Sequence, residues 1–145
     1  MTRTRKLVRM ASLLSAAAMA TPAAAQGVPD MVGTWRGTSR AVIVGATPYR
    51  PHQGEGAQFT SQPLEFTYRI DRQEGNRFLG QVVSAGPRRE TLLGAISGDN
   101  RTGVMQDDDG QSTFTLRAPD TMDICYAHNA ANNRAVTCFT LTRTR

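Results

Sequence analysis

The sequence predicts an all-β protein, built as a single antiparallel eight-stranded up-and-down (meander) β-barrel. Three observations support this fold class. No segment repeats apolar residues at helical spacing, apolar and polar residues alternate along most of the chain, and turn-forming residues recur roughly every 10 to 13 positions. Strands with one apolar face need cover, and no helix is predicted to provide it. Closure into a barrel buries that face and removes unpaired strand edges.

The amino-terminal stretch has the pattern of a secretory signal peptide. A positively charged start precedes a short apolar centre at 10–20, and Ala23–Ala25 provides the small residues that a signal peptidase requires. We therefore expect residues 1–25 to be removed and residues 26–32 to form a flexible lead. Residues 33–145 then form the single barrel domain, periplasmic or secreted.

Charge excludes one class of partner. Four of the 17 basic residues and none of the 12 acidic residues lie in 1–25, so the remainder has 13 basic against 12 acidic residues, a net charge of +1. The remaining arginines are scattered, whereas a nucleic-acid binder concentrates them on one face.

The apolar run at 10–20 is too short for a membrane span. We expect neither a nucleic-acid partner nor a membrane span.

Turns divide the domain into its predicted strands. Gly75, Gly86, Asp99 and Pro119 lie in four of these turns, and Asp109–Gly110 suits a tight two-residue hairpin because both positions tolerate positive φ. The strands expected between the turns are 33–45, 62–71, 76–84, 88–97, 101–107, 111–118, 120–128 and 134–143.

Alternation assigns an inner face to several of these strands. In 62–71 the apolar side chains occupy every second position, and 111–118 and 120–128 follow the same pattern. The interior is expected to hold Trp35, Phe66, Tyr68, Phe78, Phe114, Ile124, Tyr126 and Phe139. Gly37, Ser39 and Ala41 are small inward positions, which we expect to leave space beside the first strand.

The start of the first strand and the end of the last carry a family resemblance. Gly33-Thr34-Trp35 opens the domain, and Arg143 lies next to its carboxyl end. This pattern resembles the calycin group of lipocalin-like and avidin-like barrels, and the chain is also similar to small exported bacterial proteins. The resemblance implies that Trp35 plugs the closed end of the barrel and that Arg143 packs on its ring. The chain lacks the tryptophans of an avidin biotin pocket, so biotin binding is not implied.

Cys125 and Cys138 are predicted to form a disulfide. They lie on the last two strands, and if they face each other the hairpin centre falls between Ala131 and Asn132, inside the predicted turn. An oxidising compartment favours this pairing. A metal site would need more ligands, and a nucleophilic cysteine would need a free thiol, so we favour the structural disulfide.

The long connection 46–61 is expected to share one mouth of the barrel with the turns near Gly86, Asp109 and Ala131, because alternate turns of a meander emerge at the same end. A loop of this length is usually functional or disordered. The candidate ligand-binding residues of this mouth and the inner wall are Tyr49, His52, Glu55, Tyr68, Arg88, Tyr126 and His128. The alternative is a polar rim that only faces water.

From these features we expect a non-enzymatic barrel that binds a small, partly apolar ligand at its mouth under the 46–61 loop. No catalytic residue, metal or cofactor is predicted, although His52 and His128 could share a transition metal if they were close. The alternative is a protein-interaction or protease-inhibitor barrel acting in the periplasm, since exported metalloprotease-inhibitor barrels also carry one disulfide. Theirs lies nearer the amino-terminal half. A lipocalin-like enzyme is a third possibility.

Overall fold

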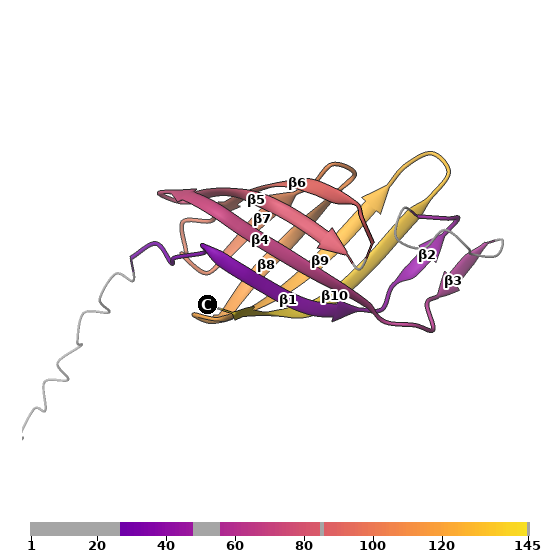
Figure 1. The fold of residues 1–145 in the computed structure, drawn as a ribbon, viewed down its shortest axis with the longest axis horizontal. Helices are drawn as coiled ribbons and strands as arrows, with labels where there is room; N and C mark the ends of the chain where they lie inside the picture. The colour runs from indigo at the N-terminus through magenta and orange to yellow at the C-terminus, as the bar shows by residue number, and fades with distance from the viewer. Residues whose placement is uncertain (1–26, 48–55, 85, 145) are drawn as a thin grey trace, which may run out of the picture.

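The computed structural model describes residues 27–47, 56–84 and 86–144, in which every regular element is a β-strand (Figure 1). The strands are β1 (Gly33–Ser39), β2 (Val42–Val44), β3 (Ala57–Phe59), β4 (Leu64–Glu74), β5 (Arg77–Ser84), β6 (Arg89–Ile96), β7 (Thr102–Gln106), β8 (Gly110–Ala118), β9 (Thr121–Asn129) and β10 (Arg134–Thr144). Among the described residues, none belongs to a helix long and apolar enough to cross a membrane.

Eight of these strands close into an antiparallel up-and-down barrel, which confirms the predicted fold class. The order is β1-β4-β5-β6-β7-β8-β9-β10, and β1 completes the ring by pairing with β10 through Thr34 and Thr144. Each strand after β4 pairs with its neighbour in sequence, as a meander requires. Closure leaves no unpaired edge within the barrel itself.

The predicted first strand, 33–45, is two strands. It is interrupted at Arg40 and Ala41, where the amide of Ala41 donates to Thr60 Oγ1 and its carbonyl accepts from the Thr60 amide (both 2.9 Å). β2 continues along β10, and β3, within the predicted connection 46–61, pairs with β2. Together β2 and β3 form an arm that extends from the barrel (Figure 1).

The predicted Asp109–Gly110 hairpin is wrong by one residue. The turn centres on Asp108 and Asp109, Gly110 begins β8, and Gly110 does not adopt positive φ. The Asp107 amide donates to the Gly110 carbonyl (3.1 Å), and the Gly110 amide donates to Asp107 Oδ1 (2.7 Å). The side chain of Asp107 therefore closes the turn, a role that Asp commonly takes.

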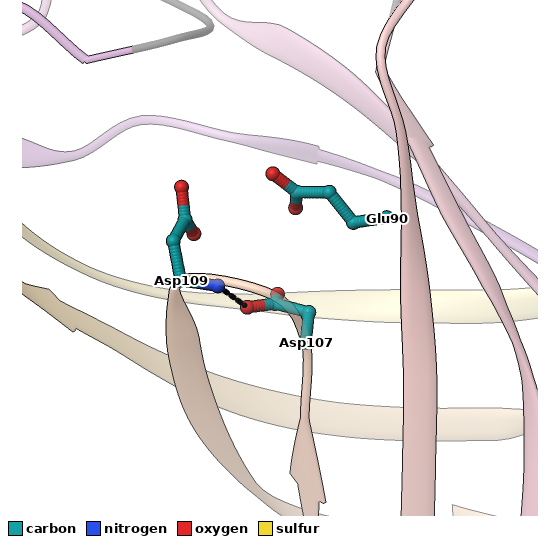
Figure 2. Close-up of side chains that lie close together, drawn as sticks. All are labelled: Glu90, Asp107 and Asp109. Atoms are coloured by element: carbon teal, nitrogen blue, oxygen red, sulfur yellow. Dashed lines mark hydrogen bonds between the residues drawn. The ribbon is translucent and has the colours of Figure 1, made fainter.

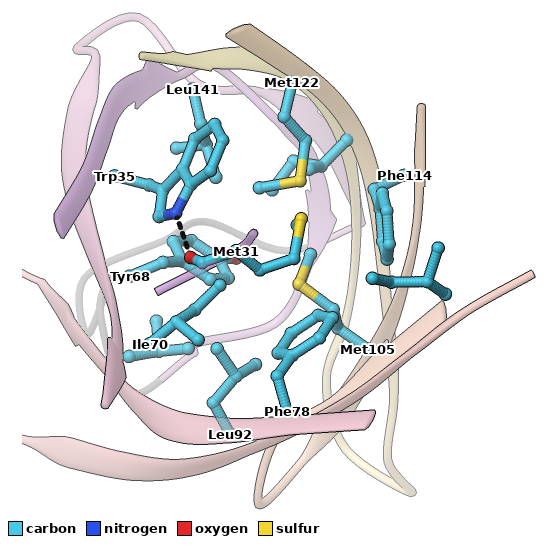
Figure 3. Close-up of a cluster of buried hydrophobic side chains, with 13 residues drawn as sticks. Met31, Trp35, Tyr68, Ile70, Phe78, Leu92, Met105, Phe114, Met122 and Leu141 are labelled. Carbon is cyan, nitrogen blue, oxygen red and sulfur yellow. Dashed lines mark hydrogen bonds between the residues drawn. The ribbon is translucent and has the colours of Figure 1, made fainter. Parts of the chain in front are cut away.

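One end of the barrel is filled by a continuous apolar core (Figure 3). Its buried residues are Met31, Trp35, Tyr68, Ile70, Phe78, Val82, Leu92, Ile96, Met105, Phe114, Met122, Ile124 and Leu141, with Phe66, Leu116 and Phe139 packed against them. All of the expected interior aromatic residues except Tyr126 belong to this core or contact it.

The lead contributes to the core as well. Met31, which we placed in a flexible segment, is fully buried, and its carbonyl accepts from the Trp35 indole Nε1 (2.9 Å; Figure 3). Its amide donates to Gln73 Oε1 (2.7 Å). The residues just before β1 therefore seal the closed end together with Trp35.

Arg143 lies over the Trp35 ring, with its guanidinium carbon 5.0 Å from the ring centroid, as the resemblance implies. Four donations hold it there: Nε to Asp120 Oδ1 (2.7 Å), Nη2 to the Pro119 carbonyl (2.9 Å), and Nη1 to the carbonyls of Asp30 (2.7 Å) and Val32 (3.1 Å). The side chain is only 3% exposed. Arg143 therefore links the lead and the β8–β9 turn to the closed end.

Cys125 and Cys138 face each other across β9 and β10 and form the predicted disulfide. Both lie on the exposed outer side of the barrel. The expectation for Gly37 is wrong, because a Cβ there would overlap the Thr140 carbonyl oxygen. Gly37 allows β10 to approach closely rather than leaving space.

Candidate functional site

A cluster of carboxylates occupies the interior at the mouth, opposite the Trp35 end (Figure 2). Glu90 projects inward from the start of β6, and Asp107 and Asp109 belong to the β7–β8 turn. Their oxygens lie within 4.8 Å of one another. Three acidic side chains at this spacing repel one another unless cations or protons compensate them.

Arg88 provides part of that compensation. Its Nε donates to Glu90 Oε1 (2.5 Å), and its Nη2 donates to Asp109 Oδ2 (3.2 Å). Glu90 is 1% exposed, whereas the Arg88 side chain is 41% exposed. The arginine therefore bridges the buried carboxylate to the rim and to solvent.

Asp107 is less well compensated. Its burial, reinforced by the charges of Glu90 and Asp109, raises its pKa to about 6, although the hydrogen bond that its carboxylate accepts from the Gly110 amide opposes this rise. Asp107 is therefore partly protonated near pH 6. A cation placed in the cluster would favour its ionised form.

Two side chains of β9 complete the polar group. Tyr126 Oη donates to Asp109 Oδ1 (2.9 Å), and burial together with the nearby Asp107 carboxylate raises the Tyr126 pKa. His128 is buried, with Nδ1 3.2 Å from Asp109 Oδ1 and Nε2 against Asn133 Oδ1. Asp109 is thus the point on which Arg88, Tyr126 and His128 converge.

Gly110 is required for this arrangement. A Cβ on Gly110 would overlap the Tyr126 ring, so only glycine lets the phenol lie across the start of β8 and reach Asp109. The sequence signal at Gly110 thus reflects close packing rather than the positive φ that we expected.

A small cavity of about 40 Å³ borders the polar group on the side of the first strand. Its polar wall is formed by Asp109, Tyr126, His128 and Thr137, and its remaining lining residues are Ser39, Ala41, Ile43, Thr47, Leu64, Phe66 and Ala135. The expected space beside Ser39 and Ala41 is therefore present. A second cavity of about 30 Å³ lies between Tyr68, Glu90, Asp107 and Tyr126.

Four of the seven predicted ligand-binding residues can be placed. Arg88, Tyr126 and His128 meet at Asp109, and Tyr68 lies deeper, beside the second cavity. Burial and the Asp107 charge raise the Tyr68 pKa, so its hydroxyl stays protonated. Tyr49, His52 and Glu55 lie outside the described residues. The alternative in which His52 and His128 share a metal is therefore not tested.

The predicted ligand-binding residues did not include Glu90, Asp107 and Asp109, which are the centre of the group, although the turn near Asp109 was expected at this mouth. Alternation carried a signal for Glu90, because it shares the inward parity of Leu92 and Ile96 in β6. An acidic residue in an apolar register is unusual and indicates a buried polar site. Nothing comparable marked Asp107 and Asp109, which resembled an ordinary solvent-facing hairpin tip.

Carboxylate oxygens at this spacing suit a hard cation such as Ca²⁺ in principle. Arg88, however, already bonds two of the three carboxylates, and the Gly110 amide bonds the third. The same oxygens equally accept hydrogen bonds from an ammonium group.

Comparison with known proteins finds no protein-family model and no curated protein that matches the chain.

Proposed function

We propose that this protein is a non-enzymatic, calycin-like binding barrel whose mouth takes a small ligand with an apolar part and a cationic or hydrogen-bond-donating head. The observation that carries the proposal is the cavity at Asp109, where an apolar wall meets a polar wall whose one carboxylate, Asp109, is clustered with Glu90 and Asp107. Ligand sites characteristically combine an apolar lining with a few converging polar groups.

Charge favours an ammonium head over a carboxylate. Among the described residues, Arg88 is the one arginine that bonds this cluster of three carboxylates, Glu90, Asp107 and Asp109. The cluster therefore carries excess negative charge when Asp107 is ionised. An anionic ligand would add to that repulsion, whereas an ammonium would relieve it. Ile43, Leu64 and Phe66 would contact the apolar part of the ligand.

We also propose that the chain is exported and that residues 1–25 are a signal peptide. The disulfide between Cys125 and Cys138 supports this, because disulfides persist in oxidising compartments. A periplasmic or secreted protein would meet its ligand outside the cytoplasm.

Calorimetric titration with three probes of matched carbon chain tests the binding proposal: n-butylamine, 1-butanol and butyrate. We expect n-butylamine to bind most tightly. Asp109→Asn should weaken its binding by about tenfold, the value of one lost charge-assisted contact. Asp71→Asn, an exposed carboxylate paired with Arg69 on the barrel surface, is the matched control and should leave binding unchanged.

Equal binding of butyrate and n-butylamine would contradict the proposed ligand class. Failure of all three probes to bind at millimolar concentration would contradict the binding function of this mouth. The alternative, a protein-interaction module, is favoured by a different surface, which lies on the outside of the barrel.

A further inference from the structure

A broad apolar groove of about 970 Å³ crosses the outer face of strands β5 to β10. Its exposed lining residues include Leu79, Leu93, Val104 and Val136, between 41% and 58% exposed, and both cysteines of the disulfide also line it. Outer faces of barrels normally present polar side chains to water. The groove lies on the outer side of the strands and the mouth cavity on the inner side, and Tyr126 and Thr137 line both.

Strand register extends the apolar surface onto the arm. Val136 of β10 faces Val42 of β2, and Val42 faces Phe59 of β3, so the three side chains share one face. Phe59 is 86% exposed, the most exposed large apolar side chain among the described residues. The arm therefore carries a protruding aromatic ring directly beside the rim of the groove.

The size of this surface lies at the upper end of the roughly 300–600 Å² that the largest apolar patch of a monomer usually reaches. The exposed fractions of Phe59, Val42 and the four exposed lining residues of the groove correspond to apolar area on the order of 500–600 Å². A stable interface buries roughly 800 Å² per partner. If polar residues around this apolar surface also contact the partner, the area buried per copy reaches the size of a stable interface.

We propose that the occupant of the groove is a second copy of this chain, in a two-fold dimer in which Phe59 of each copy enters the groove of the other. The molecule carries both complementary shapes, a protruding ring on β3 and an apolar hollow whose near edge, at Val136 of β10, lies two strands away. That proximity allows both contacts to form at once about a two-fold axis, which closes the assembly at two copies.

Charge is compatible with self-association. Charged residues of the groove, Arg72, Glu74 and Arg77, are confined to the end formed by the β4–β5 hairpin, and they include both signs. The centre of the groove is formed by leucine, valine, alanine, glutamine and threonine side chains together with the disulfide. Two copies can therefore meet across this face without opposing like charges.

Sedimentation analysis over a concentration series tests the proposal with the whole chain, processed and oxidised. We expect a monomer–dimer equilibrium. Phe59→Asp, on the knob, and Leu93→Asp, in the groove, should each raise the dimer Kd by about 30-fold or more, as for a central apolar anchor. Val28→Asp, which alters a side chain of similar exposure in the lead, is the control and should leave the Kd unchanged.

Mixing the two variants provides a decisive readout. A mixed dimer of Phe59→Asp and Leu93→Asp retains one intact contact, a native Phe59 in a native groove, whereas each variant alone retains none. The mixture should therefore dimerise more tightly than either variant alone and more weakly than the unaltered protein. A protein that stays monomeric up to about 0.5 mM, a dimer insensitive to both variants, or a mixture that gains nothing would overturn the proposal.

Discussion

The closed end of the barrel offers a sharp quantitative test in Arg143→Ala. The sequence indicates only a contact with the Trp35 ring, and a cation–π contact by itself predicts a loss of about 0.5–2 kcal/mol. The structure adds four hydrogen bonds from a side chain that is 3% exposed. At about 0.5–1.5 kcal/mol net for each bond, the four bonds and the ring contact together are worth about 2.5–8 kcal/mol. Because the Asp120 partner is 47% exposed, we expect a loss in the lower part of that range, about 3–5 kcal/mol.

Equilibrium unfolding in urea, followed by Trp35 fluorescence, measures this free energy. Arg143→Lys keeps the charge but not the planar fork of donors, so we expect it to lose about 2–3 kcal/mol. Arg117→Ala is the matched control, because Arg117 bonds Asp123 (2.6 Å) while 56% exposed, and should lose less than about 1 kcal/mol. Equal losses for Arg143→Ala and Arg117→Ala would refute the assignment of Arg143 as the link that closes this end.

Four further outcomes are expected. Gly110→Ala should destabilise the protein by about 1–3 kcal/mol through overlap with the Tyr126 ring, whereas Gly98→Ala, with open space around it, should not; equal urea midpoints would contradict this. Met31→Ala should lower the free energy of unfolding by about 2–5 kcal/mol, and an unchanged free energy would instead support the prediction that residues 26–32 form a flexible lead. The folded-state pKa of Asp107 is raised to about 6, so the folded protein binds this proton more tightly than the unfolded chain, and the free energy of unfolding should fall as pH rises from about 4 to about 6. Asp107→Asn should reduce this pH dependence in urea unfolding curves, and an unchanged pH dependence would exclude Asp107 as its source. Exported material should begin at or near Gln26 by intact mass and contain no reactive thiol by titration, and two reactive thiols would contradict the disulfide.

Alternation and turn spacing suffice to predict the barrel because a closed meander repeats one local rule in every strand. Cys125 and Cys138 could be paired for the same reason, since the register of a hairpin follows from its turn. The break at Arg40 and Ala41 could not be predicted, because Ile43 continues the inward parity of Ser39. Only the tertiary neighbours reveal that the chain leaves β4 there and pairs with β3.

The binding mouth was predictable as a location but not as a set of residues. Meander topology places the β5–β6, β7–β8 and β9–β10 turns at one end, which grouped Arg88 with His128, and both side chains contact Asp109. It gives no information on whether a turn residue points inward, and Asp109 does so because Gly110 makes room for the Tyr126 phenol. That depends on packing between β8 and β9, which is not encoded in any local pattern.

The most direct test of the central claim, that ligands bind at the carboxylate mouth, is an NMR titration of the intact barrel with n-butylamine. Trp35 is the only tryptophan, so its indole N–H reports on the closed end without ambiguity, while Gly110 and His128 report on the mouth. We predict saturable shifts of the Gly110 amide and the His128 ring, with the Trp35 indole unchanged. Shifts at Trp35 with none at Gly110 and His128 would contradict the account.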